Sequence, residues 1–138
     1  MENMPRKNSI SKIKQAVAPL LKAEPKVGFG YLFGSRSRGE TKVKSDYDLA
    51  VYFDEPEVIK RHDLLFKLAA DISRELNTDL IDIHSLNDLQ SPELKFHIIH
   101  DGILLFERGP YRVLVEPRIL NEYFDFMYLL RKYHLTNV

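Results

Sequence analysis

Residues 34–48 read GSRSRGETKVKSDYD and join two segments that have the pattern of β-strands. In the segment 26–33, large apolar side chains alternate with smaller or polar ones, a period of two that is typical of a strand. The segment 46–53 reads as a second strand and carries Asp46 and Asp48 at its start. Because side chains separated by one residue in a strand point to the same face, the two carboxylates are expected to lie together.

The pair Asp46 and Asp48 suggests a metal site. Two carboxylates held this close repel each other, and a cation between them relieves the repulsion. Carboxylate oxygens favour hard cations, so Mg²⁺ or Mn²⁺ is the expected occupant. An Asp-x-Asp pattern alone often arises by chance on a surface strand, and by itself it is weak evidence for such a site.

The pair Gly34-Ser35 strengthens the metal interpretation, because it ends the first expected strand and is separated from Asp46 by ten residues. A glycine lets the backbone turn tightly and approach an anion, and backbone N–H groups together with the Ser35 hydroxyl can hold phosphate oxygens. Arg36 and Arg38 follow directly, and guanidinium groups suit phosphate geometry. The pattern does not choose between these two arginines.

A third carboxylate, Asp82, lies in the segment 79–84, whose alternation predicts a third strand with Ile81 and Ile83 on the opposite face. An unpaired carboxylate in a half-buried strand is costly, so a neighbouring strand is expected to place Asp82 beside the Asp pair as a third ligand. Three carboxylates can share two metal ions, one activating an attacking hydroxyl and one stabilising a leaving pyrophosphate. His84 shares the Asp82 face, and either a contact with the site or a structural role fits it.

The remaining segments complete a small α+β domain. Helical spacing of apolar residues predicts four helices, and a short apolar run predicts a fourth strand. This order is typical of a mixed β-sheet covered by helices. No linker divides the chain, so residues 1–138 are expected to form a single domain, and Pro19 is expected to kink or shorten the first helix. The expected helices are 9–22, 56–76, 91–100 and 117–133, and the fourth strand is 103–106.

Composition excludes several classes of function. The 20 basic and 20 acidic residues cancel, so no overall field attracts nucleic acid or an anionic membrane, and no direct nucleic-acid binding is expected. The absence of cysteine excludes disulfides, zinc–thiolate sites and thiol nucleophiles. No apolar run is long enough to span a bilayer, and the N-terminus lacks the apolar region of a secretory signal. A cytoplasmic location is therefore expected.

The combined pattern is Gly34-Ser35, ten residues, Asp46-Tyr-Asp48 and, about 35 residues later, a strand aspartate, Asp82. It resembles the nucleotidyltransferase superfamily with the DNA polymerase β-type catalytic core. Within that superfamily, the stretches GSRSRGE and SDYDLAV resemble the minimal nucleotidyltransferases (MNT), the antitoxins of HEPN–MNT toxin–antitoxin pairs. The resemblance implies a polymerase β-type core followed by a C-terminal helix.

The resemblance also implies a chemistry, which is the transfer of AMP from ATP by a two-metal, Mg²⁺-dependent mechanism. It implies that Asp46 and Asp48 bind both metal ions, that Asp82 binds the one that activates the acceptor, and that Gly34-Ser35 binds the triphosphate. In the antitoxin family, the acceptor is a tyrosine of the partner HEPN toxin, which the modification neutralises.

Two other functions remain open. The chain can be a non-catalytic module that masks a toxin, although the three aspartates argue against this. It can also be a stand-alone nucleotidyltransferase acting on a small hydroxylated compound, although such enzymes usually add a second domain for the acceptor and 138 residues leave little room for one. The sequence does not determine the nucleotide preference, the number of AMP units, the acceptor residue or the oligomeric state.

Overall fold

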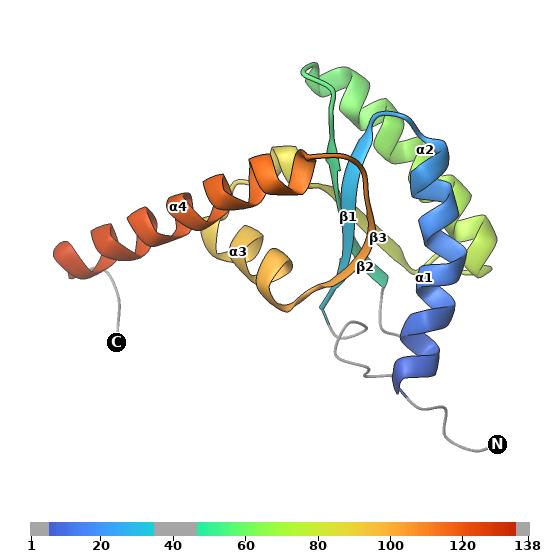
Figure 1. The fold of residues 1–138 in the computed structure, drawn as a ribbon, viewed down its shortest axis with the longest axis horizontal. Coiled ribbons are helices and arrows are strands. Elements are labelled where there is room, and N and C mark those ends of the chain that lie inside the picture. The colour runs from blue at the N-terminus through green and yellow to red at the C-terminus, as the bar shows by residue number, and fades with distance from the viewer. Residues whose placement is uncertain (1–5, 35–46, 135–138) are drawn as a thin grey trace.

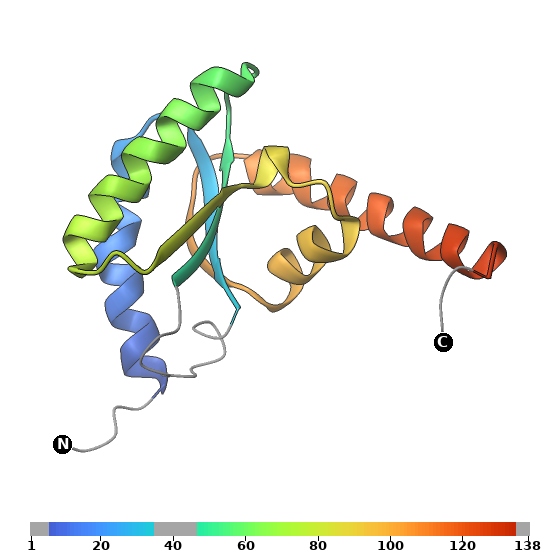
Figure 2. The same ribbon diagram turned by 180° about the vertical axis from the view of Figure 1, so that it is seen from behind.

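The computed structural model describes residues 6–34 and 47–134, which fold into a four-stranded mixed sheet with helices on both faces (Figures 1 and 2). The elements are α1 (Arg6–Ala23), β1 (Val27–Phe33), β2 (Tyr47–Phe53), α2 (Val58–Leu76), β3 (Ile81–Ser85), the short 3-10 helix η1 (Leu86–Asp88), α3 (Pro92–Asp101), β4 (Ile103–Glu107) and α4 (Tyr111–Lys132). None of the helices in these ranges is long and apolar enough to cross a membrane.

The sheet has the strand order β3-β2-β1-β4. The central strand β1 runs antiparallel to both β2 and β4, whereas β3 runs parallel to β2 after the crossover through α2. The end of β1 and the starts of the other three strands therefore meet at one end of the sheet. The expected carboxylate strands begin at this end.

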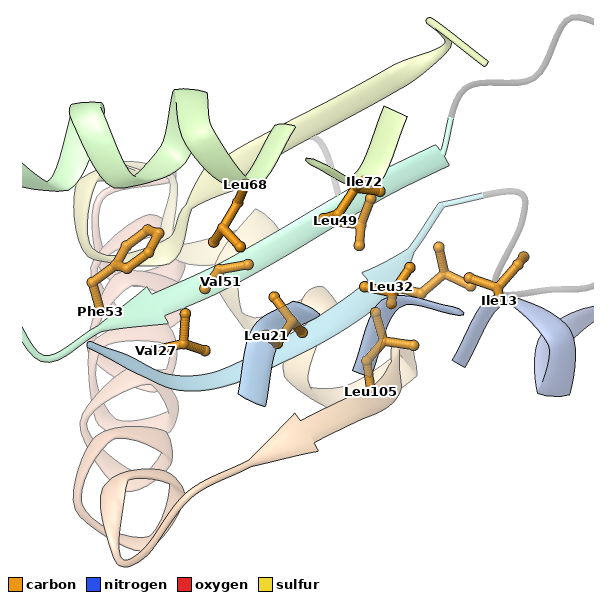
Figure 3. Packing of buried hydrophobic residues seen from close by; sticks show 11 residues of the cluster. Ile13, Leu21, Val27, Leu32, Leu49, Val51, Phe53, Leu68, Ile72 and Leu105 are labelled. Atoms are coloured by element: carbon orange, nitrogen blue, oxygen red, sulfur yellow. The ribbon is translucent and has the colours of Figure 1, made fainter. Parts of the chain in front are cut away.

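One face of the sheet carries the larger apolar core, beneath α1 and α2 (Figure 3). Leu21 of α1 and Leu68 and Ile72 of α2 pack over the alternate residues of β1 and β2 that point toward them. The fully or almost fully buried members of this cluster are Ile13, Val17, Leu21, Val27, Leu32, Leu49, Val51, Phe53, Leu68, Ile72 and Leu105.

The other face is covered by α3 and α4 and holds a second, smaller core. Ala50 of β2 lies in this core, together with Ile98 of α3 and Ile119 of α4. Because Asp48 is two residues before Ala50 in the same strand, its side chain lies on this face as well. The fold thus separates a mainly structural face from a face that also carries a carboxylate.

The boundaries predicted from the sequence hold for most elements. The helix 56–76 ends as expected, with Asn77 in the left-handed conformation at its C-cap. The helix beginning at Ser91-Pro92 is capped by the Ser91 hydroxyl, which accepts a hydrogen bond from the backbone N–H of Leu94 at 3.1 Å. Both ends follow from local chemistry that is visible in the sequence.

Two prolines lie inside helices that they were expected to start, kink or shorten. The closing helix begins at Tyr111, so the predicted start at Pro117 is wrong, and Pro117 lies inside α4. A proline at position 117 removes one helical hydrogen bond, the one to the carbonyl of Val113. Because Val113 is 75% exposed, water can bind that carbonyl instead. Pro19 likewise lies inside α1, which continues to Ala23 and is not shortened.

The second half of α4 extends beyond the sheet (Figure 1). Only its first half contributes buried residues, Val115 and Ile119, to the core. Further along, the Tyr123 ring stacks on Phe96 of α3 with 4.0 Å between centroids, and Phe124 remains 59% exposed. Helix α3 is therefore the support for the middle of α4.

A buried arginine ties the β2–α2 connection to η1. Arg61 is 8% exposed, and its guanidinium donates two hydrogen bonds to the Asp88 carboxylate, at 3.0 and 2.6 Å. It also donates to the backbone carbonyls of Glu55 and Pro56. The hydrogen bonds from Arg61 to the Asp88 carboxylate hold the pKa of Asp88 below its ordinary value. The pair therefore stabilises the fold in a pH-dependent manner.

We predict that Asp88→Asn lowers the free energy of unfolding by about 2 kcal/mol at neutral pH, because a buried cation loses its charged partner. Since the folded-state pKa of Asp88 is depressed, its contribution is complete above the unfolded pKa of about 4 and is lost as pH falls through the folded pKa. Urea unfolding should show the difference from wild type shrinking as pH is lowered from about 5.

A matched control for this prediction is Asp71→Asn, which removes a carboxylate from the Asp71–Arg74 pair on the surface of α2. The Arg74 side chain is 75% exposed, so this change should cost less than about 0.5 kcal/mol. A difference between wild type and Asp88→Asn that stays constant over the acidic range would contradict the role given to the ion pair.

Candidate active site

Three neighbouring strands place Phe33, Asp48 and Asp82 in one row across the end of the sheet. Phe33 of β1 is the register partner of Asp48 in β2, and Asp48 is in turn the partner of Asp82 in the parallel strand β3. Residues paired in this way point to the same face. The row therefore lies on the face covered by α3 and α4, as the burial of Ile81 and Ile83 against the opposite core requires.

The register thus brings Asp82 beside Asp48, as the alternation in the sequence predicts. The Asp82 side chain is 52% exposed, so solvent and ligands can reach this carboxylate. Two adjacent carboxylates on an accessible face supply the oxygen donors that a hard divalent cation prefers. These are oxygen donors of the kind that Mg²⁺ binds, although two carboxylates alone do not complete its coordination.

Gly34 packs directly against the Asp48 carboxylate. Its backbone has φ of +76°, a conformation that L side chains rarely adopt. A Cβ added at this position would also come within 3.0 Å of Asp48 Oδ2, closer than real Cβ atoms approach. Glycine is thus required twice, by the turn at the end of β1 and by the space that the carboxylate occupies.

Four of the residues singled out from the sequence, Ser35, Arg36, Arg38 and Asp46, lie outside the described residues. Their proposed roles therefore stay predictions. Within residues 6–34 and 47–134, no group of three His, Cys, Asp or Glu side chains is arranged to hold a metal ion. Asp48 and Asp82 would need at least one further ligand, and Asp46 remains the expected one.

Two aromatic rings border the carboxylate pair. The His84 Nε2 atom lies 3.2 Å from Asp82 Oδ2. The ring of His84 also lies against that of Phe33, with 6.0 Å between centroids. Phe33 was not singled out from the sequence, although its place directly before Gly34 at the strand end is a usable signal. Its position follows from the register with Asp48, which local sequence patterns do not reveal.

Comparisons with known proteins agree with this geometry. Residues 15–111 match the family model described as polymerase beta, nucleotidyltransferase. The chain is 31% identical over 105 residues to the protein adenylyltransferase MntA of Aphanizomenon flos-aquae (strain 2012/KM1/D3), which covers 72% of this chain and 69% of that protein.

Solved structures share the fold. One is a toxin–antitoxin complex crystallised with AMP-PNP, with a TM-score of 0.64 and 23% identity over 94% of this chain and 95% of that one. Another is the complex of a tri-AMPylated Shewanella oneidensis HEPN toxin with its MNT antitoxin, with a TM-score of 0.58 and 22% identity over 93% and 92% of the two chains. At these identities, the likeness establishes the architecture.

The contact between Gly34 and Asp48 can be tested by a double-mutant cycle. We predict that Gly34→Ala lowers the free energy of unfolding by about 2–3 kcal/mol, from the positive φ and from the clash with the carboxylate. In an Asp48→Ala background, the clash disappears and Gly34→Ala should cost only about 1–2 kcal/mol. Urea denaturation of the four proteins measures the coupling.

Gly109 provides the matched control, because it also has positive φ, +52°, but a Cβ there would meet nothing within 4 Å. Gly109→Ala should therefore cost about as much as Gly34→Ala does in the Asp48→Ala background. An absence of coupling between positions 34 and 48 would show that the carboxylate does not occupy this space in solution.

Proposed function

Because the chain belongs to the polymerase beta nucleotidyltransferase family, we propose that it transfers AMP from ATP to a tyrosine hydroxyl of a HEPN-family toxin and so neutralises that toxin. The observation that carries this proposal is the in-register pair of Asp48 and Asp82 beside Gly34. The naming of the 31% identical relative as a protein adenylyltransferase supports a protein acceptor. The HEPN toxins in complexes of the same fold support the class of partner.

In the proposed site, the carboxylates hold two Mg²⁺ ions. Asp46 and Asp48 would hold both ions, and Asp82 would hold the ion that activates the acceptor. When bound, the metal ions neutralise phosphate charge and make the acceptor hydroxyl a better nucleophile. Gly34 and Ser35 hold the triphosphate through backbone N–H groups and a hydroxyl, with Arg36 or Arg38 adding positive charge.

The reaction needs no covalent intermediate on this chain. The tyrosine oxygen bonds to the α-phosphorus of ATP, the bond from that phosphorus to the bridging oxygen breaks, and pyrophosphate leaves. The hydroxyl proton passes to solvent. Positioning and charge neutralisation supply most of the rate enhancement in such transfers, which is consistent with a chain that has no cysteine.

The exposure of Asp82 is compatible with an acceptor presented by another protein. Asp82, on the acceptor side, is 52% exposed and lies on the edge strand β3. A tyrosine presented by a folded partner can approach such an edge.

We predict that Asp48→Asn slows AMP transfer at least about 1,000-fold, because several kcal/mol of charge stabilisation are lost and each 1.4 kcal/mol is tenfold in rate. Asp46→Asn should have the same effect. The measurement is the intact mass of a HEPN-family protein from the same genome after incubation with ATP and Mg²⁺. The partner should gain mass in whole adenylyl units with the wild type.

The matched control is Asp63→Asn. Asp63 is an exposed residue of α2, the helix that covers the opposite face of the sheet. It should leave transfer unchanged. Transfer that survives both Asp46→Asn and Asp48→Asn would overturn the metal assignment. An unmodified toxin that is still bound and neutralised by these variants would indicate a masking module, and turnover of a small hydroxylated compound without a protein partner would indicate a stand-alone enzyme.

A further inference from the structure

Asp82 is in direct contact with a histidine of the same strand, His84. His84 lies two residues further along the strand and therefore on the same face. Its Nε2 atom is 3.2 Å from Asp82 Oδ2, a close polar contact between the two side chains. In the part of the chain that the structure describes, no other side chain forms a hydrogen bond or ion pair with the Asp82 carboxylate. Among the described residues, His84 is therefore placed to fix its orientation.

The surroundings of His84 hold its ring in place. Its register partner in β2 is Ala50, whose small side chain leaves room on the sheet for an imidazole. The ring of Phe33, from β1, lies against it with 6.0 Å between centroids and an interplanar angle of 49°. The His84 side chain is 34% exposed, so it is partly packed while Asp82 remains accessible.

We propose that His84 is a positioning residue for Asp82: its Nε2–H, 3.2 Å from Oδ2 in this structure, donates a hydrogen bond to Oδ2 when Oδ1 binds a divalent cation. This inference rests on the metal-binding role that the proposed function gives to Asp82. Carboxylates that bind metals are commonly oriented by a hydrogen bond to a second residue, and loss of that residue typically weakens metal affinity or activity 10- to 100-fold.

The need for such a partner follows from the place of Asp82 in the fold. It lies on an edge strand and is 52% exposed, so the sheet alone does not restrict the rotation of its carboxylate. Asp48, in contrast, lies on an inner strand and is packed against Gly34. Packing against Gly34 restricts one carboxylate of the pair, and the contact with His84 is the means proposed for orienting the other.

Two amide substitutions separate this role from simple packing. The side-chain nitrogen of glutamine occupies nearly the position of Nε2 in histidine, whereas that of asparagine occupies nearly the position of Nδ1. Since the contact with Asp82 is made by Nε2, His84→Gln should be able to donate the proposed hydrogen bond and His84→Asn should not. Both variants are polar and remove the ring, so a purely structural role predicts similar defects for both.

The experiment uses the full chain and measures Mn²⁺ binding by electron paramagnetic resonance, in the presence of AMP-PNP and at fixed pH. We expect the Kd for Mn²⁺ to rise about tenfold or more in His84→Asn and to stay close to the wild-type value in His84→Gln. His97→Leu, which removes the histidine of the exposed His97–Asp101 pair on α3, is the matched control and should bind Mn²⁺ as the wild type does.

A second readout is the Mg²⁺ concentration that gives half the maximal rate of AMP transfer. It should rise in His84→Asn, with the rate at saturating Mg²⁺ recovering most of the wild-type value. Urea unfolding midpoints verify that the variants fold. Equal Kd values for wild type and His84→Asn, or equal defects in His84→Asn and His84→Gln, would overturn the proposal.

The two proposals can fail separately. A wild-type protein that binds Mn²⁺ with AMP-PNP but modifies no HEPN-family protein would contradict the proposed transfer, and the Kd values of the His84 variants would still decide the positioning role. Transfer by the wild type, together with an unchanged Kd in His84→Asn, would support the enzyme and remove His84 from its site.

Discussion

The register between β2 and β3 is the constraint on which the site depends. It pairs Asp48 with Asp82, and a shift of one residue would turn Asp82 to the opposite face of the sheet. The shift is opposed by Ile81 and Ile83, which pack against the core beneath α1 and α2 and would be exposed by it. Apolar packing on one face thereby determines where charge lies on the other.

One face of the sheet carries most of the apolar packing and the other carries the carboxylates, which explains how a short chain can place charged groups on neighbouring strands. Like charges on neighbouring strands destabilise a sheet, and the cost must be met by the rest of the fold. Here the larger core lies on the opposite face, and the edge position of β3 leaves Asp82 in contact with water. The two aspartates occupy paired positions on neighbouring strands, and neither is fully buried.

Much of this arrangement could be predicted from the sequence, because it follows from local patterns. Period-two alternation located the strands, and it correctly separated Asp82 from Ile81 and Ile83. The start of α4 could not be located in this way, because an exposed proline such as Pro117 is tolerated in a helix that packing holds in place. The contacts of His84 with Asp82 and Phe33 depend on strand order and register, which are set by long-range packing. The roles of Ser35, Arg36, Arg38 and Asp46 remain predictions, since these residues lie outside the described part of the chain.

The contact between Gly34 and Asp48 has a consequence for how such a site can change over generations. While the carboxylate is present, any larger residue at position 34 meets it, so the glycine is retained for as long as the aspartate is. A lineage that loses Asp48 removes one of the two constraints on position 34 and leaves the positive φ, and once a side chain has filled the space the aspartate can return only with a clash. Loss of the carboxylate is therefore easier than its recovery.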